Sequence, residues 1–216
     1  MGIGKTARWS VAMFCGLSLC ACAHTPAASL NLLPKQPAAA TMSKVNIANK
    51  LTLGADEIGR RFLKLIAGLD SRDDITPTRI QEIMGFPVQV APGELGAVVW
   101  SADLGGGWRY SFDYIPESSS LLRGVGLSFE HDIDRFSDMK PVCGLDFEHY
   151  DSALRNMGFV ASPTYGPIGQ LENWRYAKFA KDGIGGDIII SLVPQNMVAG
   201  SAGRVCAKSI STLNGR

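Results

Sequence analysis

The sequence lacks a surplus of charge of either sign: its 216 residues include 21 lysines and arginines and 20 aspartates and glutamates, a formal net charge of +1. A general nucleic-acid-binding protein needs a basic surplus, so that class is excluded. A disordered chain is rich in charge and poor in apolar residues, whereas this one is 19% charged and 46% hydrophobic. Its 24 glycines and 11 prolines are close to average, which excludes collagen-like and low-complexity classes.

The motifs of common enzyme classes are also missing. The sequence has no GxSxG nucleophile elbow, no GxxxxGK[ST] phosphate-binding loop and no HExxH metalloprotease helix. It has no CxxC pair, and its three histidines, His24, His131 and His149, do not have the spacing of zinc ligands. We therefore expect a protein that is not an enzyme and that holds no cofactor.

Long hydrophobic runs are scarce, and the one that stands out extends from Trp9 to Ala23, after Lys5 and Arg8. A run of about 15 residues is shorter than the roughly 20 that a membrane-spanning helix needs. A positive segment followed by a short apolar one is typical of a secretory signal peptide; a retained anchor or a buried core helix is the alternative. We predict that residues 1–21 are a signal peptide.

Two cleavage sites compete at the end of this segment. Ala21-Cys22-Ala23 fits the A-x-A pattern of ordinary signal peptidase, with cleavage after Ala23. Leu19-Cys20-Ala21-Cys22 resembles the lipobox of bacterial lipoproteins, which implies lipidation of Cys22, and Ala23 after it implies sorting to the outer membrane. We favour the lipobox, so the expected location is the periplasm, with an acyl anchor in the lipid bilayer of the outer membrane.

Cysteine is the residue whose placement agrees with export. Three of the five cysteines lie in the signal region, and Cys143 and Cys206 remain in the body of the protein. An even pair in an oxidising compartment predicts a disulfide, with two unpaired buried thiols as the alternative.

The rest of the chain divides into a tether and a folded body. Residues 22–45 are rich in alanine and proline and show no helical or strand period, which predicts a semi-extended tether. The body is predicted to be α+β, with two tandem helix-plus-antiparallel-sheet units over residues 46–135 and 136–216.

Periodicity predicts the elements of both units. Apolar residues at helical spacing predict a helix over 55–69, and a second helix begins with Thr76 as its cap and Pro77 and ends at Gly85. Alternation predicts strands over 97–102, 108–115 and 121–129. In the second unit we expect a helix over 146–157, capped by Asp146, then strands over 173–180, 187–193 and 204–212, with a turn opening at 181–183.

Short identities indicate that the two units arose by duplication. Met84-Gly85-Phe86 and Met157-Gly158-Phe159 fall at the end of a predicted helix in each unit. Two further short matches relate the units. Val99-Trp100 pairs with Asn173-Trp174 through its tryptophan, while Trp108-Arg109-Tyr110 recurs as Trp174-Arg175-Tyr176.

The segment Ile75-Thr76-Pro77-Thr78-Arg79-Ile80-Gln81-Glu82-Ile83-Met84-Gly85-Phe86-Pro87 resembles the signature of the SmpA/OmlA lipoproteins, accessory proteins of outer-membrane protein assembly. Thr76, Gly85 and Pro87 match that signature, whereas Arg79 replaces a glutamine and Asp74 replaces a glycine. The resemblance covers about residues 70–130. A tandem of such units is similar to the β-lactamase-inhibitor protein fold, which implies a sheet presented to a target enzyme.

Aromatic residues beside arginines are the candidate partner-binding residues, because Trp, Tyr and Arg are enriched at binding hot spots. The candidates are Trp100, Trp108, Arg109, Tyr110, Trp174, Arg175 and Tyr176. The alternation favours another interpretation, in which the aromatics fill the core and the two arginines occupy the opposite, exposed face.

An acidic cluster is the weak candidate for a metal site, since Ca²⁺ takes several oxygen ligands; the alternative is a solvated connector. It consists of Glu130, Asp132, Asp134 and Asp138.

The function that we predict is non-enzymatic binding of a protein partner, as an inhibitor or immunity protein that neutralises a toxic or lytic enzyme. The alternative is an accessory role in outer-membrane assembly or envelope integrity.

Overall fold

The computed structural model describes residues 53–88, 98–180, 187–195 and 204–215. The residues predicted to form the signal peptide, the lipidation site at Cys22, the tether and the turn at 181–183 lie outside the described residues. The described elements follow in the order α1 (Ala55–Ala67), η1 (Arg72–Asp74), α2 (Pro77–Met84), β1 (Val98–Gly105), β2 (Trp108–Ile115), β3 (Gly124–His131), η2 (Lys140–Val142), α3 (Phe147–Asn156), β4 (Val160–Tyr165), β5 (Leu171–Lys178), β6 (Ile188–Gln195) and β7 (Cys206–Thr212).

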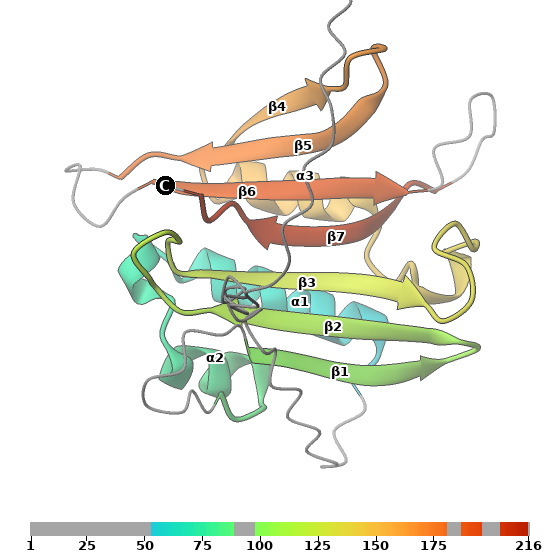
Figure 1. Cartoon of the computed structure of the whole chain (residues 1–216), viewed down its shortest axis with the longest axis horizontal. Coiled ribbons are helices and arrows are strands. Elements are labelled where there is room, and N and C mark those ends of the chain that lie inside the picture. Colours follow the sequence, from blue (N-terminus) through green and yellow to red (C-terminus); the bar gives the residue numbers. More distant parts are fainter. Residues whose placement is uncertain (1–52, 89–97, 181–186, 196–203, 216) are drawn as a thin grey trace, which may run out of the picture. The chain divides into compact units, whose positions relative to one another are not determined.

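The fold is α+β, with three α-helices and a seven-stranded antiparallel sheet in the order β1-β2-β3-β7-β6-β5-β4. Figure 1 views the sheet from the side opposite the helices, which lie behind the strands. Aromatic contacts confirm that all three helical segments share this one face. Phe62 of α1 and Phe86 after α2 contact Phe112 of β2, and Phe147 of α3 contacts Trp174 of β5.

The helix boundaries follow from their caps, as the sequence predicts. Thr76 accepts a hydrogen bond from the amide of Arg79 (3.2 Å), and Asp146 accepts one from the amide of His149 (3.0 Å). Gly85, after α2, and Gly158, after α3, both have φ of +86°, a conformation that a side chain disfavours.

One strand was not predicted from the sequence. The described residues from 136 onward contain four strands rather than three, because β4 precedes the three that were expected. Its sequence, VASPTY, includes Pro163, which has no amide hydrogen for a ladder and is tolerated here because β4 lies at the edge of the sheet. Strand β3 also begins later than predicted, at Gly124 rather than Leu121, which forms only an isolated bridge to Gly215.

The two halves of the sheet meet where β3 pairs with β7, a boundary that we call the β3–β7 seam. It contains three residue pairs in register, whereas β2 and β3 share eight. Beyond the ladder, the hydroxyl of the buried Thr212 accepts a hydrogen bond from the amide of Val125 (3.0 Å). This seam therefore depends on side chains as well as on main-chain pairing.

Arg72 joins the parts of the chain that meet at one end of the seam. Its side chain is buried, and its guanidinium donates to three main-chain carbonyls, those of Asp187 (2.8 Å), Arg123 (3.1 Å) and Leu213 (2.6 Å). These carbonyls stand before β6, before β3 and after β7. Burial lowers the pKa of Arg72, and the charge of nearby Asp187 partly offsets this effect.

Candidate binding surface on the open face of the sheet

The predicted aromatic candidates lie mostly in the core. Trp100, Trp108, Tyr110 and Tyr176 are buried, and Trp174 is half-buried against Phe147. In this fold their rings face the helices, so they are not available as a free contact surface. The alternation of aromatic and polar residues, which predicts that the rings fill the core, therefore agrees with the structure better than the interpretation of these rings as a binding hot spot.

The other face of the sheet carries no helix among the described residues, and we call it the open face (Figure 1). The strand register aligns its side chains in rows that cross several strands. One row is Ser101, Ser111, Ser128 and Ser209, and its first two hydroxyls are 2.9 Å apart. A neighbouring row is Asp113, Gly126, Ser211, Ser191, Arg175 and Ser162. Small polar side chains thus run across both halves of the sheet, and Ser191 in the second row is buried.

Arg109 and Arg175 lie on this open face, as the alternation predicts. Both side chains are exposed, and they come from β2 and β5, on opposite sides of the seam. Arg109 forms an ion pair with Asp132 and stands beside Glu130 in the register. Arg175 stands between Ser191 and Ser162. On this face, therefore, Arg109 has an acidic partner, whereas Arg175 is flanked by serine side chains.

Asp113 is the acidic group in the row of side chains that leads to Arg175. Its carboxylate lies over Gly126 of β3, where an added Cβ would be 2.4 Å from the carboxylate Oδ1. Burial raises the pKa of Asp113, and a hydrogen bond from its own backbone amide opposes that rise. In the described part of the chain it forms no ion pair, so a cation brought by a partner would be stabilised at this position.

The acidic cluster considered for metal binding has other contacts. Asp132 pairs with Arg109, Asp134 accepts from the amide of Phe136 (2.8 Å), and Asp138 accepts from the amide of Lys140 (3.0 Å). Among the described residues, no group of three or more His, Cys, Asp and Glu side chains could hold a metal ion. The structure thus does not bring Glu130, Asp132, Asp134 and Asp138 together as ligands.

Cys143 and Cys206 form the predicted disulfide, which joins the segment after η2 to the start of β7. Their Cα atoms are 5.4 Å apart, and the two residues are 63 positions apart in the sequence. Closing a loop of this length is worth about 4 kcal/mol in the chain-entropy model.

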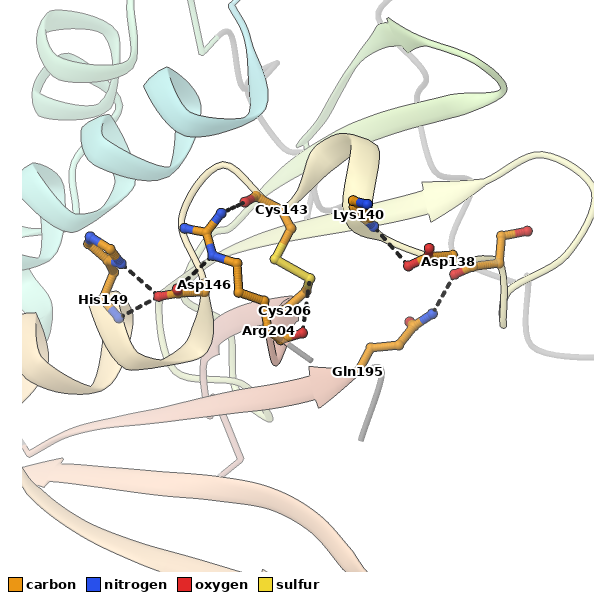
Figure 2. The surroundings of a disulfide bond; sticks show 9 residues. Asp138, Lys140, Cys143, Asp146, His149, Gln195, Arg204 and Cys206 are labelled. Atoms are coloured by element: carbon orange, nitrogen blue, oxygen red, sulfur yellow. Dashed lines mark hydrogen bonds and ion pairs between the residues drawn. A yellow bond between two sulfur atoms is a disulfide. The ribbon is translucent and has the colours of Figure 1, made fainter. Parts of the chain in front are cut away.

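The start of α3 is fixed beside this disulfide, as Figure 2 shows. The carboxylate of Asp146 accepts hydrogen bonds from the ring Nδ1 of His149 (2.6 Å) and from the guanidinium of Arg204 (3.0 Å). Burial alone would raise the pKa of Asp146, but the hydrogen bonds from His149 and Arg204 outweigh it, so the pKa is lowered.

A cleft of about 570 Å³ lies near the Arg72 end of the seam, with Arg72 and Arg123 among its lining residues. Both guanidinium groups donate to the main chain within the described region: Arg72 as given above, and Arg123 to the carbonyl of Asp73 (3.0 Å). Their donors are engaged in holding the fold, so the cleft offers little to an anionic ligand.

No helix in the described part of the chain is long and apolar enough to span a membrane. None of the protein-family models, curated proteins and solved structures compared with this chain matches it.

Sequence reasoning missed the roles of Arg72, Asp113 and Gly126. Their contacts arise from strand register between distant segments, for which the local sequence carries no signal.

Proposed function

We propose that this protein is an outer-membrane lipoprotein that binds a protein partner without catalysis, through the open face of its sheet. The observation that carries the proposal is the row of side chains that crosses the seam from Asp113 to Arg175. Small hydroxyl side chains let a partner approach the strands closely, while the two charges provide orientation and specificity. On this proposal the partner is a toxic or lytic enzyme, and the protein acts as its inhibitor or immunity protein.

A tandem arrangement of two related units supports such a continuous face. The glycines of the two Met-Gly-Phe segments share φ of +86°, after α2 and after α3. Strands β2 and β5 are each the second strand after those helices, and each is the neighbour of an edge strand. This order favours the pairing of Trp108-Arg109-Tyr110 with Trp174-Arg175-Tyr176 over the pairing that aligns Trp100 of β1 with Trp174.

Charge reversal on the open face tests the proposal. Wild-type protein and the Arg109→Glu/Arg175→Glu variant are used as bait in periplasm from producing cells, and captured proteins are quantified by mass spectrometry. Lys64→Glu is the control, because Lys64 is exposed on α1, on the other side of the sheet. We expect one protein to be captured by the wild type and the control and at least about tenfold less by the double variant. Equal capture by all three would contradict a binding role for this face.

The captured partner then separates inhibition from the alternative role. Inhibition requires that the purified partner has an enzymatic activity that falls on titration with this protein. The resemblance of residues 75–87 to the assembly lipoproteins favours the second candidate. In that case the partner is an assembly component, and deletion of the gene impairs the outer-membrane barrier. For the anchor, Cys22→Ala is expected to release the protein from the membrane fraction; unchanged fractionation would exclude lipidation.

A further inference from the structure

Two large apolar side chains project from the loop between β3 and η2. Ile133 is 92% exposed and Phe136 is 71% exposed. We refer to residues 132–139 as the β3–η2 loop; it leaves the sheet at the end of β3 (Figure 1). Two such side chains exposed within four residues forgo the stabilisation that burial of apolar surface gives. Neither a metal site nor a solvated acidic connector in this segment would account for that exposure.

The main chain of this loop is held by contacts from other elements. The amide of Gln195, on β6, donates to the carbonyls of Arg135 (3.3 Å) and Ser137 (3.1 Å), and Lys208, on β7, donates to the carbonyl of Arg135 (3.1 Å). Figure 2 shows Gln195 reaching this segment beside Asp138.

Local contacts fix the tip of the loop and its downstream end. The amide of Ser137 donates to the carbonyl of Asp134 (3.0 Å), and Met139 is fully buried. The apolar side chains are therefore displayed on a backbone that is already ordered, which lowers the entropy lost on binding.

We infer that the β3–η2 loop is a docking element that inserts Ile133 and Phe136 into an apolar pocket, bordered by side chains of mixed charge, on a folded protein partner. The inference rests on the proposed function, because the partner is the same protein that binds the open face. Charge selects the kind of partner: residues 130–140 carry four acidic and two basic side chains, Asp132 pairs with Arg109, and the Arg135 guanidinium lies over the Phe136 ring at 4.7 Å from its centroid. The loop therefore presents charges of both signs, which a protein pocket with a rim of mixed charge complements. It lacks the basic surplus that an anionic phospholipid surface attracts, which disfavours a membrane as the occupant.

Phe179 provides a matched control. It is 68% exposed, close to the value for Phe136, and it follows β5 at the opposite end of the sheet (Figure 1). A photo-crosslinking amino acid is placed at position 136 or 179 of the full chain in producing cells, and the adducts are identified by mass spectrometry. The adduct protein is then purified and titrated with wild-type protein and with Ile133→Asp, Phe136→Asp and Phe179→Asp variants.

We expect a discrete protein adduct from position 136 and not from position 179. Ile133→Asp and Phe136→Asp should each weaken binding of that protein at least about tenfold, with Phe179→Asp unchanged. Adducts of position 136 only with a second copy of this chain, only with lipid, or with nothing would overturn the inference. Unchanged binding by both loop variants would do so too. If Arg109→Glu/Arg175→Glu abolishes binding while the loop variants do not, the docking role of the loop is refuted and the proposed function stands. If no partner is found at all, both the docking role and the proposed function are refuted.

Discussion

The buried arginine at the β3–β7 seam allows a sharp prediction about stability. In Arg72→Met, a side chain of similar length remains, but three main-chain carbonyls lose their donor. A hydrogen bond in which one partner is charged contributes about 1.5–3 kcal/mol. Removing the guanidinium also removes the penalty of burying its charge, which offsets part of that loss. We expect a net loss of about 3–5 kcal/mol in the free energy of unfolding.

Urea denaturation followed by tryptophan fluorescence measures this change, with the disulfide kept intact. For a domain of this size the slope is about 2 kcal/mol per molar urea, so the midpoint should fall by about 2 M. Arg72→Lys keeps the charge but cannot donate to three carbonyls from one fork, so its stability should be closer to that of Arg72→Met than to the wild type.

The matched control is Arg60→Met. Arg60 pairs with Asp56 on the surface of α1, and its side chain is 56% exposed. Solvent screens such an exposed pair, so its loss should barely move the midpoint. If Arg72→Met loses less than about 1 kcal/mol, or no more than the control, the carbonyl contacts of Arg72 do not hold the seam.

Three further outcomes follow from the described contacts. Reducing the disulfide should lower the free energy of unfolding by up to about 4 kcal/mol, measured as a midpoint shift with and without reductant; an unchanged midpoint would show that the cross-link is not stabilising. Asp113→Asn should be more stable than the wild type at neutral pH, because burial raises the pKa of Asp113 and so destabilises the fold only when its carboxylate is charged. Well below the ordinary pKa of aspartate the two proteins should be equally stable; a gain that persists in acid would contradict this cause. Gly59→Ala should lose about 1–3 kcal/mol despite the better helix propensity of alanine, because its Cβ would lie 2.4 Å from the hydroxyl oxygen of the buried Tyr150 on α3; a stabilised variant would show that the two helices can separate freely.

The helices and several strands could be predicted because their signals are local. Caps at Thr76 and Asp146 mark where helices begin, and the alternation of aromatic and polar residues defines β2 with its exact bounds, Trp108–Ile115. The disulfide was predictable for another reason: after the signal region is set aside, only one pair of cysteines remains. In each case the residues that decide the outcome are close in sequence or few in number.

The contacts that were missed depend on distant parts of the chain. Arg72 lies in a charged stretch of sequence, and its burial results from three carbonyls at positions 123, 187 and 213. The position of Asp113 on the polar face was predictable, but the rise in its pKa was not, since the space for its side chain comes from Gly126 on another strand. The exposure of Ile133 and Phe136 likewise depends on how β6 and β7 hold the loop.

The open face can be continuous only if the β3–β7 seam stays closed, and the seam is held at both ends of β7. Arg72 binds the carbonyl of Leu213, just after β7, while the disulfide attaches Cys206 at its start. These two sites lie at opposite ends of a seven-residue strand, about 20 Å long, so independent effects on global unfolding should add.

The additivity can be measured by combining Arg72→Met with reduction of the disulfide. If the two halves unfold together, the losses should sum to within about 0.5 kcal/mol. If the seam opens before the rest of the fold, the combination should instead produce a separate early transition, with exposure of the amides of β3 and β7 to hydrogen exchange. That second result would mean that the Arg72 contacts and the disulfide together keep the seam closed, so that the combination should weaken partner binding across the open face. A single transition with additive losses would refute this dependence.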